Sequence, residues 1–424
     1  MDKAIVFVSI LVLRKFPEYL TYCTENDIKA LVLDEHNHII DNLLEEGVFS
    51  GNNNRDIASL HFYTSLQDAQ DAVAIWNKEY NIIGLINFRD DFVKQAALIA
   101  AYLDLPSPGL IASSICSKKD LQRQYLSEFS PRSQSIHLRM LSDLPSQYPF
   151  VIKPIDSSSS RNVIQINDEN SLSLIPKEMF GHIVLCEDYV RGCEYSVESI
   201  VSSGTILFCG ITQKITNENE SHYFAEMGHI NPPINLTDKL KDDLLSVNKK
   251  IIEQLNFDSG IYHAEYKITD EGAVVLMEVA CRAPGDAIMD LYSLSFRSEF
   301  YKLLIYCLTN NDELHQLLSD FKEQKVIAAQ FYINHPRGTL VDVCTSGFRR
   351  VWFYEDDRAG YEEYCVNKFK GQPYFYIYRN RGDLLDKITN SYDRSAAVVF
   401  TCTNSQDVYR MTRSLRSAVR YKIC

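Results

Sequence analysis

The chain has 424 residues, of which 46% are hydrophobic and 23% are charged, and its formal net charge is -13. This length allows about two to four domains with buried cores. The acidic balance argues against nucleic-acid binding, because a phosphate backbone needs clustered positive charge. Eleven cysteines without C-x-x-C pairs fit free thiols in a reducing, cytoplasmic compartment better than a disulfide framework or a zinc site. No apolar run is long enough to span a membrane, and the N-terminal one, which ends at Arg14 and Lys15, is expected to be a buried strand.

The chain is expected to fold in four parts. In residues 1–112, apolar runs alternate with helical stretches such as 91–105, and this βαβ pattern predicts a parallel sheet. Residues 113–188 are expected to form a small α+β segment, and residues 189–325 an antiparallel sheet followed by a helix. In residues 326–424, a terminal helix follows four expected strands, at 328–334, 351–355, 374–378 and 396–402. The predicted fold class is therefore α/β combined with α+β.

Two glutamates and an arginine carry the clearest chemical signal. Two short hydrophobic runs separated by a turn-like segment at 270–272 predict adjacent antiparallel strands, so Glu265 on the first and Glu278 on the second are expected to share one pocket. Paired carboxylates bind hard divalent cations, and Mg²⁺ in particular takes a few carboxylate oxygens together with substrate phosphates. Arg282, four residues after Glu278, adds fixed positive charge beside that metal. This combination predicts a site for phosphoryl transfer.

Upstream of these residues lies a candidate phosphate loop. Lys153 stands at the end of an apolar strand and is followed by Ser157, Ser158, Ser159 and Ser160. A loop of small residues can fold backbone N–H groups and hydroxyls over phosphate oxygens, while the lysine supplies a point charge.

A strand-to-strand hinge follows at residues 183–201. Its first strand carries Glu187 near its end, and its second strand begins at Glu194. The backbone amides of Tyr189 and Val190 could read the edge of a purine base, and Glu194 could accept both ribose hydroxyls. The hinge therefore predicts a nucleotide site.

In this order, the segments resemble those of the ATP-grasp superfamily over roughly half of the chain or more. SKKDLQRQYL resembles the first lysine segment, with Lys119 at the position that contacts the nucleotide phosphates, and VIKP resembles the second lysine strand. CEDYVRGCEYSVE resembles the adenine-and-ribose segment, and HAEY and MEVACRAPGDAI resemble the metal-binding strands.

The resemblance implies an ATP-grasp fold and a set of roles. Residues 1–112 would be the pre-ATP-grasp domain, 113–188 a mobile lid, 189–325 the catalytic sheet and 326–424 a C-terminal α+β subdomain. ATP and Mg²⁺ are the implied cofactors, with two metal ions bound by Glu265 and Glu278 and Mn²⁺ as an alternative metal. Arg282 would be the catalytic residue that stabilises the transferring phosphoryl group and the tetrahedral intermediate.

Within the superfamily, the closest resemblance is to L-amino-acid ligases, which are carboxylate–amine ligases that make dipeptides. It rests on NFRDDFVKQAALIAAYLDLPSPG, on FAEMGHINPP and on the long region after residue 325. The resemblance implies ATP-driven amide formation between amino acids through an acyl phosphate, with release of ADP and phosphate, and it suggests a homodimer. The residues expected to line the substrate cavity are Lys214, His222, Tyr223, Glu226, His229 and Gly285. The sequence identifies neither the acyl donor nor the amine acceptor.

Two departures from the family pattern keep alternatives open. The phosphate loop is rich in serine where the family is usually rich in glycine, and Ala280 stands where many members have an asparagine. One alternative is an ATP-grasp enzyme with another acyl acceptor, against which the C-terminal region argues. The other is a nucleotide-binding protein that has lost catalysis, against which the retained glutamates, lysines and Arg282 argue.

Overall fold

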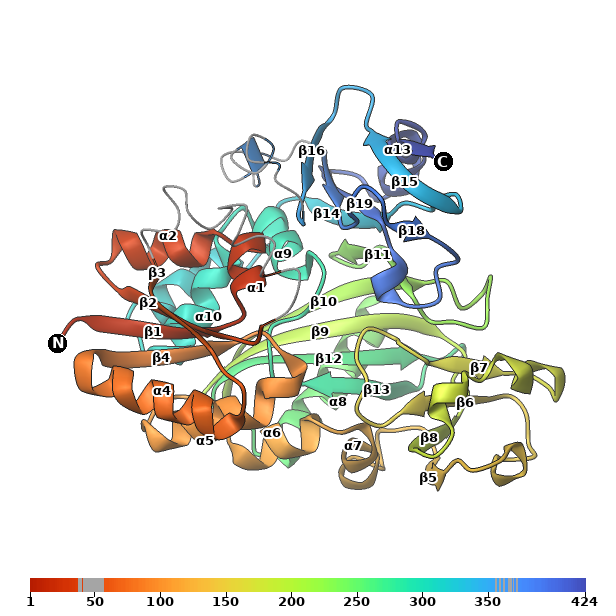
Figure 1. The fold of residues 1–424 in the computed structure, drawn as a ribbon, viewed down its shortest axis with the longest axis horizontal. Helices are drawn as coiled ribbons and strands as arrows, with labels where there is room; N and C mark the ends of the chain where they lie inside the picture. The colour runs from red at the N-terminus through yellow and green to blue at the C-terminus, as the bar shows by residue number, and fades with distance from the viewer. Residues whose placement is uncertain are drawn as a thin grey trace.

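The computed structural model describes residues 1–36, 40, 57–354, 357, 360, 363, 364, 368, 370 and 373–424. Its described strands form a nine-stranded sheet, two four-stranded sheets and one three-stranded sheet. Figure 1 shows the N-terminal sheet in red and orange at the left, the strands of a second four-stranded sheet in yellow at the right and the C-terminal strands in blue above. Among the described helices, none combines the length and the apolar character that a membrane span requires.

The N-terminal sheet is parallel, as the βαβ pattern predicts, with strand order β3-β2-β1-β4. Because successive strand residues point to opposite faces, helices cover it on both sides: Ile5 of β1 packs with α1 and α2, and Val6 packs with α4 and α5. The predicted first strand and the helix within 91–105 are thus confirmed as β1 and α5. The elements are β1 (Lys3–Val8), α1 (Ile10–Lys15), α2 (Glu18–Glu25), β2 (Lys29–Asp34), β3 (Ile57–Phe62), α4 (Leu66–Glu79), β4 (Asn81–Asn87) and α5 (Val93–Tyr102).

A second four-stranded sheet, which we name the lid sheet after the lid predicted for residues 113–188, has the order β5-β8-β6-β7 with antiparallel neighbours. Its strands are β5 (Ser133–His137), β6 (Phe150–Pro154), β7 (Ile164–Ile166) and β8 (Ile183–Asp188). The two helices that precede it, α6 (Leu110–Cys116) and α7 (Lys119–Tyr125), lie elsewhere. Ala112 of α6, and Leu126 just after α7, pack into the core of the large sheet. The large sheet therefore supports the segment that carries Lys119.

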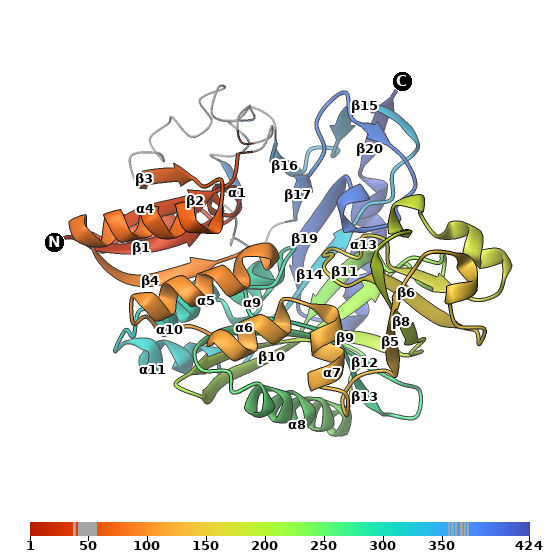
Figure 2. The same cartoon turned by 60° about the horizontal axis from the view of Figure 1, so that its bottom comes forward.

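The large sheet has the order β13-β12-β9-β10-β11-β14-β19-β17-β16, and its neighbours are antiparallel except for β16 and β17. Val197 of β9 packs against α8 on one face, and Ile200 packs toward α9 and α10 on the other (Figure 2). The strands are β9 (Cys193–Ser202), β10 (Thr205–Thr216), β11 (Glu226–Asn231), β12 (Gly260–Ile268), β13 (Val274–Ala280), β14 (Ile327–Tyr332), β16 (Arg349–Trp352), β17 (Tyr374–Ile377) and β19 (Ala396–Cys402). The helices are α8 (Asp238–Gln254), α9 (Ile288–Phe296), α10 (Phe300–Leu308) and α11 (Leu314–Leu317).

The four strands predicted after residue 326 are present and extend the large sheet as β14, β16, β17 and β19; position 355, at the end of the second, lies outside the described residues. The predicted terminal helix is α13 (Ser405–Ser417), but it is not the last element. β20 (Arg420–Ile423) follows it and pairs with β15 (Gly338–Cys344), which also pairs with β18 (Leu384–Leu385). Every cysteine that the structure describes is free.

Candidate active site

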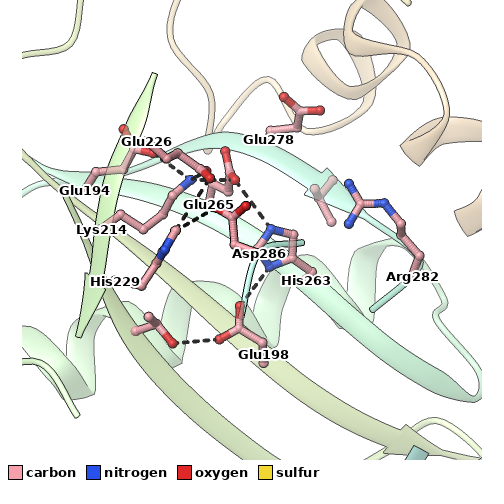
Figure 3. Close-up of polar contacts among 12 residues, drawn as sticks. Glu194, Glu198, Lys214, Glu226, His229, His263, Glu265, Glu278, Arg282 and Asp286 are labelled. Atoms are coloured by element: carbon pink, nitrogen blue, oxygen red, sulfur yellow. Dashed lines mark hydrogen bonds and ion pairs between the residues drawn. The ribbon is translucent and has the colours of Figure 1, made fainter. Parts of the chain in front are cut away.

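Glu265 on β12 and Glu278 on β13 are directly opposed in the antiparallel register. The predicted strand pair is therefore confirmed. Opposed residues have their side chains on the same face of a sheet, and both carboxylates line one cavity of about 110 Å³. Figure 3 shows them with the charged groups that surround them.

A single buried lysine is the counter-ion of three carboxylates, including Glu265. Lys214 on β10 has a side chain that is 1% exposed, and its Nζ lies 2.8 Å from Glu194, 2.7 Å from Glu226 and 2.6 Å from Glu265. Three carboxylates thus surround its ammonium group. Burial lowers the pKa of Lys214, but the three carboxylates more than offset this and hold the pKa well above its usual value. The prediction that Lys214 contacts substrate gains no support from this position, because a substrate would have to displace a carboxylate.

His263 is a second cation beside Glu265. Its Nδ1 lies 2.8 Å from Glu198, and its Nε2 lies 3.4 Å from Glu265. Burial lowers the pKa of His263, but hydrogen bonds with Glu198 and Glu265 outweigh burial and raise it to about 9.

Glu278 has a lysine of its own. Lys119, the first residue of α7, has its Nζ 2.9 Å from Glu278 Oε1 and also donates to the backbone oxygen of Ser157. Lys119 therefore links the serine loop, residues 157–160, to β13. Ala280 lies on the same face of β13 as Glu278, since side chains alternate along a strand, and it offers only a methyl group.

The two opposed carboxylates fit a divalent cation of the Mg²⁺ type. Their side chains are 23% and 36% exposed, so both remain accessible from the cavity. Mg²⁺ is usually held by one or two carboxylates and completes its shell with waters and substrate phosphates. Glu265 and Glu278 would supply those carboxylates, with no third protein ligand from Ala280.

Arg282 is oriented by a carboxylate that lies just after the last strand of the N-terminal sheet. Asp90 opens η2 (Asp90–Phe92), which follows β4. Its Oδ2 lies 2.7 Å from Nη2 of Arg282, and its Oδ1 accepts a hydrogen bond from Nε. Nη1 of Arg282 donates to the backbone oxygen of Ala283 at 2.7 Å. Burial raises the pKa of Asp90, but nearby cations, chiefly Arg282, more than offset burial and lower it.

In the hinge region, Lys153 and Arg123 share the carboxylate of Glu187. Nζ of Lys153 lies 2.7 Å from Oε2, and Nε of Arg123 lies 2.5 Å from Oε1. Burial lowers the pKa of Lys153 to about 8, and the pull of Glu187 offsets this only in part. Arg123 was not predicted from the sequence, although it lies four residues after Lys119 on α7 and therefore on the same face of that helix.

The predicted hinge connects β8 to β9. The backbone oxygen of Val190 accepts a hydrogen bond from Lys267 at 3.2 Å, and the Lys267 ammonium lies 5.3 Å from the centre of the Tyr189 ring. The carboxylate of Glu194, predicted to receive the ribose hydroxyls, is bound to Lys214. Its role stays a prediction.

The serine loop adopts backbone conformations that usually require glycine. Ser159 and Ser160 have φ values of 59° and 56°, and Asn162, just after the loop, has a φ of 58°. This left-handed region costs most residues other than glycine roughly 1–2 kcal/mol each. The N–H of Ser391 donates to the backbone oxygen of Ser159 at 3.0 Å. The loop is therefore held from the C-terminal region as well as by Lys119.

Two cavities flank the serine loop. The larger, of about 870 Å³, lies between this loop, the N-terminal sheet and residues 282–286, and Lys119 and Asp90 are part of its wall. The smaller is the cavity of about 110 Å³ over the opposed glutamates. Arg282 and Gly285 line both cavities.

Glu226 and Asp286 line one wall of the smaller cavity, and together with the buried His229 behind it they form an acidic corner. Nε2 of His229 lies 3.6 Å from Glu226 Oε2 and 3.7 Å from Asp286 Oδ2. Within the described part of the chain, neither ring nitrogen of this buried histidine has a hydrogen-bond partner. Arg394 holds Asp286 through contacts of 2.7 and 3.0 Å. The three groups of the corner are close enough to hold a cation.

The structure thus brings most of the predicted site residues together but not all of them. His222 bonds to the backbone of Gln165 and lines a shallow surface hollow, and Tyr223 packs near Lys387. Neither lines the two cavities, so their assignment to the substrate gains no support. Other groups at the site were not predicted from the sequence: Asp90, Arg123, Asp286 and Arg394.

Comparison with known proteins agrees with this arrangement. Residues 146–290 match the model of an ATP-grasp domain. Dapdiamide A synthase from Enterobacter agglomerans is 26% identical over 151 residues, which are 34% of this chain and 35% of that protein. D-alanine–D-alanine ligase from Petrotoga mobilis is 23% identical over 138 residues, 31% of this chain and 46% of that protein. The matched segment thus spans less than half the length of either relative.

Solved structures match over nearly the whole chain. An L-amino acid ligase from Bacillus licheniformis superposes with a TM-score of 0.76 at 16% identity, covering 100% of this chain and 99% of that one. Carboxyaminoimidazole ribonucleotide synthase from Aspergillus clavatus, solved with ATP, gives a TM-score of 0.69 at 12% identity and covers 98% of each chain. Residues 146–290 are therefore an ATP-grasp domain, and the chain as a whole has the ATP-grasp fold with a parallel N-terminal sheet.

Proposed function

We propose that the protein is an ATP-dependent carboxylate–amine ligase that joins amino acids through an acyl phosphate and releases ADP and phosphate. The observation that carries this proposal is the opposed pair Glu265 and Glu278, which shares one small cavity with Arg282. Phosphoryl transfer requires positioning and charge stabilisation more than covalent chemistry from the protein. Carboxylates for Mg²⁺, a guanidinium and nearby lysines are the groups that such a reaction uses.

In the proposed reaction, a substrate carboxylate attacks the γ-phosphorus of ATP, which gives an acyl phosphate and ADP. An amine then attacks the acyl carbon and loses a proton, and phosphate leaves. Mg²⁺ bound by Glu265 and Glu278 would neutralise charge between the phosphates. Lys119 and Lys153 would hold the phosphate chain, and Arg282 would stabilise charge that develops in both steps. The lid sheet and the serine loop would exclude water from the acyl phosphate.

The acidic corner supports an amino acid as one substrate. Its three acceptor groups lie beside the opposed glutamates, so an ammonium group could bind there while its carboxylate faces Arg282. A cavity of about 110 Å³ with a polar wall favours a small, polar acyl donor. The larger cavity would admit the amine.

The proposal is tested by ADP release from MgATP with a panel of single amino acids plus hydroxylamine, followed by pairs of amino acids without it. Hydroxylamine traps an acyl phosphate as a hydroxamate whatever the natural amine is. We expect ADP and a hydroxamate when a single amino acid is supplied with hydroxylamine. We expect an amide when a pair of amino acids is supplied without it. A hydroxamate without any dipeptide would indicate another acyl acceptor. No ADP with any combination would indicate a nucleotide-binding protein without ligase activity.

A further inference from the structure

The donors of Arg282 are divided between the protein and the cavities. A guanidinium has five N–H donors. The carboxylate of Asp90 accepts the N–H of Nε and one N–H of Nη2, and the backbone oxygen of Ala283 accepts one N–H of Nη1. Each terminal nitrogen therefore keeps one N–H, and this pair can bind two oxygens of one phosphoryl group. Arg282 borders both cavities, so that pair has access to a bound ligand.

Asp90 is held in place by its own loop. The side chain of Asn87 accepts from the N–H of Arg89 at 3.1 Å and donates to the oxygen of Arg89 at 2.8 Å. Arg89 pairs with Asp34 at 3.1 Å and with Asp91 at 2.6 Å. Of the three consecutive charged residues 89–91, only Asp90 therefore reaches across to Arg282.

We propose that Asp90 is a positioning residue: it fixes the guanidinium of Arg282 so that its two remaining N–H groups face the transferring phosphoryl group. This inference rests on the proposed function. Because Asp90 lies in the short helix that follows β4 of the N-terminal sheet and Arg282 follows β13, the contact crosses 192 residues of sequence. The N-terminal part of the chain thus completes the phosphoryl site even though it carries none of the metal ligands.

The test measures binding of orthovanadate, a mimic of the transferring phosphoryl group, by calorimetric titration into protein saturated with MgADP. Four proteins are compared: wild type, Asp90→Asn, Arg282→Lys and the double variant. Asp90→Asn is expected to weaken orthovanadate about 10-fold, because a neutral amide presents a donor to the guanidinium. Affinity for MgADP alone should stay within about 2-fold of wild type. The double variant should bind orthovanadate no more weakly than Arg282→Lys.

Asp386→Asn is the matched control, since Asp386 pairs with Arg337 at 2.9 Å on the surface with both side chains 72% exposed; it should leave both affinities unchanged. If Asp90→Asn does not fold, Asp90→Ser provides the same test. If Asp90→Asn binds orthovanadate as tightly as wild type does, the positioning role alone is overturned. The same holds if the loss of orthovanadate affinity in the double variant equals the sum of the losses in the two single variants. A wild-type protein that does not bind MgADP would instead overturn the proposed function, and this inference with it.

Discussion

Two buried charge clusters at the site have opposite balances. In the hinge cluster, two cations, Arg123 and Lys153, share the single carboxylate of Glu187. In the sheet cluster, three cations, Lys214, His263 and Arg394, face five carboxylates, those of Glu194, Glu198, Glu226, Glu265 and Asp286. The first has a surplus of positive charge and the second a surplus of negative charge.

This difference separates the tasks of the two regions. A buried surplus of charge is costly unless a ligand of opposite sign compensates for it. The hinge cluster is thus suited to the phosphates of a nucleotide, and the sheet cluster to Mg²⁺ and to a substrate ammonium. An overall charge of -13 does not conflict with ATP binding, because the positive surplus is local.

The largest effect is expected at Glu278, whose pair with Lys119 lies at the cavity. Glu278→Ala should reduce ADP production by about 10³-fold or more, because one of two metal carboxylates is lost. Since Glu278 is partly exposed, the unfolding midpoint should change little. The control is Glu253→Ala, which removes an exposed carboxylate paired with Lys249. Normal ADP production by Glu278→Ala at saturating Mg²⁺ would remove Glu278 from the metal site.

The balance of the sheet cluster is tested by Lys214→Met. This substitution removes the cation that Glu194, Glu226 and Glu265 share and leaves these three carboxylates near one another. Removing one partner of a buried ion pair typically costs about 3–5 kcal/mol in the free energy of unfolding. Urea unfolding measures this loss. Lys267→Met is the matched control, because Lys267 is also buried but pairs with one carboxylate, Glu218. Equal losses in the two variants would show that sharing among three carboxylates has no special effect.

The sequence predicts those parts of the site that lie within one strand pair or one loop. The periodicity of residues 260–280 fixes both strands and their turn, and this places Glu265 opposite Glu278. Contacts between distant segments leave no local pattern: Asp90 reaches Arg282 across 192 residues, and Arg394 reaches Asp286 across 108. For the same reason, the ion pairs of Lys214 with three carboxylates from different strands could not be predicted from the sequence.

The hinge cluster should give nucleotide binding a pH dependence. The pKa of Lys153 is lowered to about 8 by burial, so in the free protein its ammonium is lost as the pH rises above that value. Phosphates bind the charged form and raise its pKa again. MgADP affinity should therefore be constant below pH 7 and fall by up to about 10-fold per pH unit above pH 8. Calorimetric titration at several pH values measures the affinity for MgADP. The Lys153→Arg variant should show no fall in affinity above pH 8. A wild-type affinity that stays unchanged up to pH 9.5 would contradict the role of Lys153.

The smallest effect concerns the serine loop, which follows Lys153 in the chain and lines the cavity over the opposed glutamates. Ser159 has a left-handed φ of 59°, so Ser159→Gly should relieve strain and raise the free energy of unfolding by about 0.5–1 kcal/mol. Ser157 is not among the residues with positive φ, and Ser157→Gly should lower that free energy by a similar amount, because glycine gains more freedom in the unfolded chain. Urea unfolding of both variants gives the two signs directly. Opposite signs would show that the loop keeps its glycine-like shape in solution despite its serines, whereas destabilisation by both substitutions would show that Ser159 is not strained.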